Sequence, residues 1–88
     1  MNKFPNLWWF VIVNPRTQRS QLYRCSEMAA AVSSFVDDFE KYVLPTDVLV
    51  CVEVDDKIPA DQCEVGYFTV VVKTSRHITR IDDEDNDD

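Results

Sequence analysis

The chain has 88 residues, of which 45% are hydrophobic and 28% charged, and its net charge at pH 7 is -7. A chain of this length forms one domain and buries only about 60 to 65% of its unfolded surface, so we expect a thin core. The longest apolar runs fall short of the ~20 residues that a membrane helix needs, and the first residues lack the pattern of a signal peptide. We therefore expect a cytoplasmic protein that does not enter a membrane.

Charge is divided along the chain into four blocks of alternating sign. Residues 1–26 carry four cations and no acid, residues 27–64 carry ten acids and two lysines, residues 65–81 carry three cations and no acid, and residues 82–88 carry six acids. The last block has no apolar residue, which is typical of a disordered segment. The sequence therefore predicts a single domain over residues 1–81 and an acidic, disordered tail. The other blocks form solvated faces or select a partner by charge.

The first predicted element is a strand over residues 7–13, which read LWWFVIV. Successive side chains of a strand point to opposite faces of a sheet, so an unbroken apolar run predicts that both faces need cover. Residues 14–20 begin with Asn-Pro and hold no apolar residue, which is typical of a turn. A short strand over residues 21–25 follows, and we expect the two strands to pair as a hairpin.

An amphipathic helix is predicted over residues 27–43. Ser26 stands where an N-cap belongs, and Glu27 suits the positive end of the helix dipole. Pro45 ends the helix, because the residue before a proline is pushed out of the helical region. One face is apolar at helical spacing and would pack on the sheet. Its residues are Met28, Val32, Phe35, Val36, Phe39 and Val43.

Two further strands are predicted in the second half of the chain. Residues 48–54 alternate, with four valines on one side and Leu49, Cys51 and Glu53 on the other. Residues 55–66 form a long acidic loop.

The last strand begins at Tyr67, with Phe68 and Val70 on one side and Val71 on the other. Residues 75–81 either extend this strand or form a separate edge strand, and the sequence leaves both alternatives open. The order β-β-α-β-β predicts an α+β domain, in which the helix packs on one face of an antiparallel sheet of about four strands.

We expect the helix to cover the four valines of residues 48–54 together with Phe68, which leaves the other sheet face open to solvent. Trp8 and Trp9 are neighbours in a strand, so one of them lies on each face. We place Trp8 on the open face, since Trp9 is in phase with the aliphatic Leu7, Val11 and Val13. An apolar and aromatic patch on so small a protein is typical of an interaction site.

The sequence favours a protein-binding module in which the open face docks and the acidic helix and loop select a basic partner. Small size, acidity and the absence of motifs favour an inhibitor or modulator of a host protein, of the kind that phages and mobile elements encode. Such a protein can present carboxylates where nucleic-acid phosphates would sit. The predicted partner-binding residues are Trp8, Phe10, Leu49, Tyr67, Val71, Asp37, Asp38, Glu40, Asp55, Asp56, Asp61 and Glu64.

Two alternatives use the same face. In the first, sheet aromatics stack on the bases of single-stranded nucleic acid, basic residues meet the phosphates, and the acidic tail competes for them. Its predicted contacts are Arg16, Arg19, Arg24, Lys73, Arg76 and Arg80. Net acidity makes nucleic acid the less favoured partner. In the second, two copies pair through the open face as a homodimer.

Catalysis, metal binding and cofactor binding have no signature in the chain, and we expect none of them. Cys25, Cys51 and Cys63 include no C-x-x-C pair, and His77 is the single histidine. A disulfide framework or a zinc site needs more ligands at closer spacing. Free cysteines of this kind behave as small buried hydrophobes.

Overall fold

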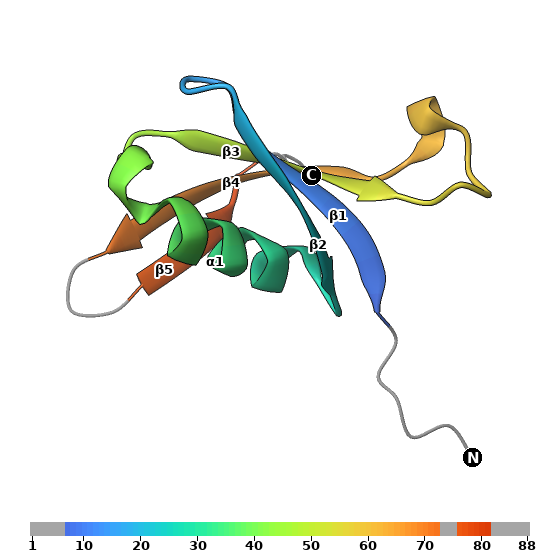
Figure 1. Cartoon of the computed structure of the whole chain (residues 1–88), viewed down its shortest axis with the longest axis horizontal. Helices are drawn as coiled ribbons and strands as arrows, with labels where there is room; N and C mark the ends of the chain where they lie inside the picture. Colours follow the sequence, from blue (N-terminus) through green and yellow to red (C-terminus); the bar gives the residue numbers. More distant parts are fainter. Residues whose placement is uncertain (1–6, 73–75, 82–88) are drawn as a thin grey trace, which may run out of the picture.

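One helix lies across one face of a five-stranded antiparallel sheet (Figure 1). The computed structural model describes residues 7–72 and 76–81. Its elements are β1 (Trp8–Asn14), β2 (Arg19–Cys25), α1 (Met28–Phe39), a 3-10 helix (Glu40–Tyr42), β3 (Val48–Val54), a second 3-10 helix (Ala60–Gln62), β4 (Val65–Val72) and β5 (Arg76–Arg80). The acidic tail predicted over residues 82–88 lies outside the described residues.

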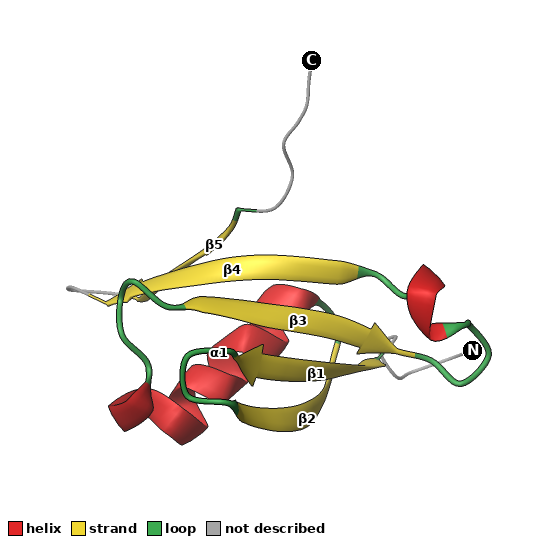
Figure 2. Cartoon of the chain, turned by 90° about the horizontal axis from the view of Figure 1, so that it is seen from above, coloured by secondary structure: helices red, strands yellow, loops and turns green. Residues whose placement is uncertain are grey.

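The strands are arranged in the order β2-β1-β3-β4-β5, and every neighbouring pair is antiparallel. Figure 2 shows them side by side with α1 behind them. The α+β class and the helix-on-sheet arrangement are confirmed. The sheet has five strands instead of about four, because residues 76–80 form a separate edge strand that pairs with β4.

The helix is shorter than predicted at both ends. Glu27, and not Ser26, is the N-cap, because the backbone of Glu27 is still extended at φ -156° and ψ 162°. The α-helix ends at Phe39 and tightens into the 3-10 turn Glu40–Tyr42. Its last turn carries no basic residue, and the next cation along the chain is Lys41, in the 3-10 turn.

The core lies between α1 and the sheet face that it covers. The predicted apolar face of the helix is confirmed, since Val32 and Phe35 have no exposed surface. From the sheet, β1 and β3 supply side chains that are equally buried. The buried apolar residues are Phe10, Ile12, Met28, Ala31, Val32, Phe35, Val36, Leu49, Cys51, Phe68 and Val70.

The predicted faces of β1 and β3 are wrong. In β3, Leu49 and Cys51 lie under the helix, while the four valines lie on the other side of the sheet. The cause is register: Leu49 pairs directly with Phe68, and residues that pair directly point to the same face. A shift of one residue exchanges the two faces of a strand, and alternation within β3 alone does not fix that register.

The faces predicted for Trp8 and Trp9 are also exchanged in the structure. Trp8 shares its side of β1 with the buried Phe10 and Ile12, so it lies on the helix side, whereas Trp9 lies on the open side. Trp8 is nevertheless 41% exposed and Trp9 45% exposed. Trp8 stays exposed because it begins β1 at the end of the sheet that α1 does not reach.

Neighbouring substitutions in β3 test this assignment of faces. We expect Leu49→Ala to lower the free energy of unfolding by about 2 to 5 kcal/mol, because it leaves a cavity in the core. Val50→Ala removes a side chain that is partly in water and should cost about 1 kcal/mol. Urea unfolding of both variants measures the difference. A larger cost for Val50→Ala would contradict the faces described here.

Candidate functional site

The sheet face opposite α1, called the open face from here on, is apolar along β1 and β3 and largely apolar along β4, where Thr69 is its one polar residue. It faces the reader in Figure 2. Cross-strand pairs such as Trp9 with Val54 and Val13 with Val50 form its middle, and Leu22 and Tyr67 extend it to both sides. Its apolar residues are Trp9, Val11, Val13, Leu22, Val48, Val50, Val52, Val54, Val65, Tyr67 and Val71.

The open face is large for a small protein. The four strands β1 to β4, about 4.8 Å apart and each about seven residues long, span roughly 400 Å². Apolar patches beyond a few hundred Å² on a monomer mark interaction sites. Leu22 is 46% exposed and Tyr67 41% exposed. Among the described residues, these large side chains of the open face are therefore accessible to solvent.

No acidic residue points from the described strands onto the open face. The one acid inside a described strand, Glu53, lies on the helix side, because it pairs directly with the buried Phe10. Arg24 is on the open face, and its guanidinium lies 5.7 Å from the centre of the Trp9 ring. In a chain with net charge -7, this face therefore differs in charge from the rest of the molecule.

Acidic residues meet the open face at one end only. A hollow of about 410 Å³ lies where β1 begins and β3 ends. Trp9 and Val54 line it together with Asp55, Asp56 and one cation, Lys57. The structure thus brings two of the predicted acidic residues beside the apolar face. The other acids of this loop, Asp61 and Glu64, are exposed.

The helix acids are not part of the same surface. Asp37 forms an ion pair with Arg76 of β5 at 2.7 Å, and Asp38 accepts a 2.5 Å hydrogen bond from the hydroxyl of Tyr23 in β2. Burial and this hydrogen bond raise the pKa of Tyr23, so its hydroxyl stays protonated. These contacts hold α1 to both edge strands, on the side of the sheet away from the open face.

The structure sorts the remaining predicted partner-binding residues. Tyr67 and Val71 lie on the open face, and Glu40 is exposed at the end of α1. Phe10 and Leu49 are 4% and 0% exposed, so their predicted place on an exposed surface is wrong. Sequence reasoning missed Trp9, Leu22 and the valines of β3, all of which lie on the open face. Their signal was present in the alternation but was assigned to the wrong side.

Most of the cations proposed to meet nucleic acid have partners inside the protein. Arg76 pairs with Asp37, and Arg80 pairs with Glu64 at 2.9 Å. The Arg19 guanidinium lies 3.7 Å from the centre of the Tyr42 ring. Lys73 lies outside the described residues.

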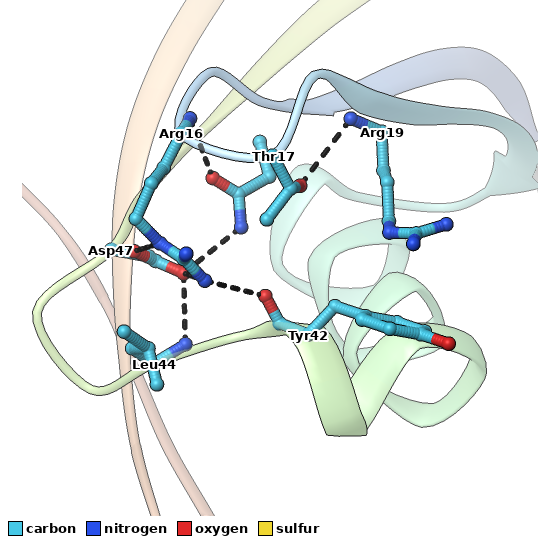
Figure 3. Close-up of polar contacts among 7 residues, drawn as sticks. Arg16, Thr17, Arg19, Tyr42, Leu44 and Asp47 are labelled. Carbon is cyan, nitrogen blue, oxygen red and sulfur yellow. Dashed lines mark hydrogen bonds and ion pairs between the residues drawn. The ribbon is translucent and has the colours of Figure 1, made fainter.

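Arg16 belongs to a polar cluster that the sequence did not predict (Figure 3). Its Nε donates to Asp47 at 2.6 Å, and its terminal nitrogen donates to the Tyr42 carbonyl at 2.9 Å. Asp47 also accepts hydrogen bonds from the Asn14 amide at 3.0 Å and from the Leu44 backbone N–H at 2.8 Å. The Asp47 side chain is 2% exposed, so these donors replace the water that it loses.

The cluster fastens the turn after β1 to the segment that leads from α1 into β3. Arg16, together with the Leu44 N–H and the Asn14 amide, lowers the pKa of Asp47 from its ordinary 3.8 to about 2. Arg16 is thus committed to a structural ion pair, which weighs against a role in phosphate binding.

The described residues show no feature that favours thiol chemistry, metal binding or a membrane-spanning helix. Burial raises the pKa of the Cys51 thiol to about 12, so this thiol is unreactive at neutral pH. Residues 7–72 and 76–81 hold no cluster of three His, Cys, Asp or Glu side chains that could bind a metal ion. In the same ranges, no helix combines the length and the apolar character that crossing a membrane requires.

Comparison with known proteins gives no relative: no protein-family model, no curated protein and no solved structure matches the chain.

The Asp47 cluster predicts a specific loss of stability in acid. Because folding lowers the pKa of Asp47, its contribution is complete only well above pH 3.8 and is lost as the pH falls through 3.8 towards 2. We expect Asp47→Asn to unfold more easily than the wild type by about 2 kcal/mol at pH 6. Urea unfolding of both proteins between pH 6 and pH 2 measures this difference, which should shrink as the pH falls. A difference that stays constant over this range would contradict the described role of the Asp47 charge.

Proposed function

We propose that this chain is a non-enzymatic protein-binding module whose interface is the open face. One observation carries the proposal: a largely apolar face over four strands, β1 to β4, with Trp9, Leu22 and Tyr67 each more than 40% exposed and no acid pointing onto it from the described strands. Tryptophan and tyrosine are the residues that most often anchor protein interfaces. An apolar centre without carboxylates also avoids the cost of burying unpaired charge.

The partner that this surface favours has an apolar patch bordered by basic residues. Asp55 and Asp56 adjoin Trp9 at the end of the open face, where they can meet cations at the rim of an interface. Rim charges of this kind speed association and select the partner. A second copy is less favoured, because two chains of net charge -7 repel one another as they approach.

Occupying a surface of another protein is how an inhibitor or modulator acts, and we extend the proposal to that role. Acidity supports a target surface that otherwise contacts nucleic acid, since carboxylates at the rim would meet the same cations as phosphates do. Direct binding of single-stranded nucleic acid has one supporting observation, the position of Arg24 beside Trp9. The ion pairs of Arg16, Arg76 and Arg80 weigh against it.

Adjacent residues of β2 provide a matched test. Leu22 and Gln21 are both exposed, and they lie on opposite faces of the sheet. We expect Leu22→Asp to weaken binding of the partner at least tenfold, because it buries an unpaired carboxylate in the interface. Gln21→Asp adds the same charge outside the interface and should bind like the wild type. Proteins retained from a lysate by the wild type and by Gln21→Asp, but not by Leu22→Asp, are then purified and titrated by calorimetry.

Three results would contradict the proposal. Partners that bind both variants equally would move the interface away from the open face. A wild-type dimer in sedimentation, dissociated by Leu22→Asp alone, would show that a second copy occupies it. Tight, salt-sensitive binding of single-stranded RNA or DNA that Leu22→Asp removes would favour nucleic acid instead.

A further inference from the structure

A second hollow, of about 510 Å³, opens on the helix side of the sheet, where α1 begins. We call it the Trp8 pocket, after the side chain that lines both it and the hollow beside Asp55. Phe10 and Phe68 form its apolar base, and each is only 4% exposed. Its volume is within the range of sites that hold a small ligand or a large side chain.

The pocket is bordered by the first turn of α1 and, next to it, by a glycine in β4. The helix begins at Met28, so it leaves the end of the sheet uncovered. Gly66 in β4 has no side chain, and a Cβ there would lie 2.9 Å from both the Met28 sulfur and the Phe68 ring. The single glycine of the chain therefore allows these side chains to pack closely next to the hollow.

Carboxylates outnumber cations around the pocket. Glu27, Glu53 and Glu64 line it, and the cation among its lining residues, Arg80, already pairs with Glu64 at 2.9 Å. Within the described part of the chain, Glu53 and Glu27 have no side-chain hydrogen bond or ion pair. Glu53 is also partly buried, on the central strand β3. A cation that enters the pocket would lie beside these carboxylates and be attracted by their negative charge.

The chemistry of the lining favours an organic cation over a metal ion. Among the described residues, no three acidic, cysteine or histidine side chains come close enough to bind a metal. Trp8 instead offers an exposed indole ring, which is the side chain that binds cations best through its π face. A guanidinium group is planar, so it can stack on an aromatic ring and still donate hydrogen bonds in pairs to a carboxylate.

We propose that the Trp8 pocket binds an arginine side chain of the partner, with the guanidinium on Trp8 and donating to Glu53. This inference rests on the proposed function and deepens it, because it assigns one basic residue of the partner to the Trp8 pocket. Trp8 and Trp9 are neighbours on opposite faces of β1, so a partner that extends round this end of the sheet reaches the pocket and the open face together.

The pocket can be tested without knowing the partner. The probe is N-acetyl-arginine amide, titrated into the labelled 88-residue chain and followed by NMR at the Trp8 indole N–H and the Gly66 amide. We expect saturable shifts at both positions, with a dissociation constant of about 1 to 10 mM, as is usual for so small a ligand. The matched probe is N-acetyl-citrulline amide, which has nearly the same shape without the charge, and it should cause no saturable shift.

Two variants locate the contact. Glu53→Gln keeps the size of the side chain and removes its charge, and we expect it to weaken arginine binding at least fivefold. Glu40→Gln removes one charge at the opposite end of α1 and should bind arginine like the wild type. The amide spectra of both variants also report whether the fold is kept. Equal shifts from arginine and citrulline, or equal weakening by both variants, would overturn the proposal.

The two proposals fail separately. A partner that depends on Leu22, combined with no arginine binding at Trp8, overturns the pocket assignment alone. Arginine binding that Glu53→Gln weakens, combined with no partner that depends on Leu22, supports the pocket and overturns the proposed function.

Discussion

The structure is governed by the size of its one described α-helix relative to its sheet. A helix of 12 residues is about 18 Å long, and it covers one face of a sheet whose five strands are about 24 Å across. Among the described elements, nothing covers the other face of the sheet or one end of the face that α1 packs on. The open face and the Trp8 pocket are both consequences of this mismatch. The contacts of Asp37, Asp38 and Asp47 hold the helix and its connections in that position.

Features of the fold that depend on one segment of the sequence could be predicted, and features that depend on pairing between distant segments could not. The helical face from Met28 to Phe39 and the strands β1 to β4 were predictable, because periodicity within one segment determines them, whereas the separate edge strand β5 was left open. Burial of Leu49 was not, because it depends on pairing with Phe68 nineteen positions further along the chain. The same limit explains Trp8 and Trp9, whose faces are decided by what β1 pairs with and by where α1 lies.

The candidate site was predictable in kind and less so in detail. A leftover apolar face follows from having one helix and an unbroken apolar strand, and it is present. Which cations remain available could not be predicted, because Arg16 meets Asp47 only when the turn after β1 folds beside the end of the helix segment. The sequence did not indicate a buried role for Asp47, because a single acid two residues after a proline is typical of an ordinary loop.

The arginines of the two outer strands have a consequence for assembly. β2 and β5 form the edges of the sheet, and each carries two arginines, at positions 19 and 24 and at positions 76 and 80. An edge strand exposes unpaired backbone groups that can pair with another chain, and charged side chains along it oppose such pairing. Sheets with a broad valine-rich face are prone to growing into fibrils by adding strands at their edges. Charged side chains on both edge strands oppose that growth, even where an arginine is paired with an acid of the same chain.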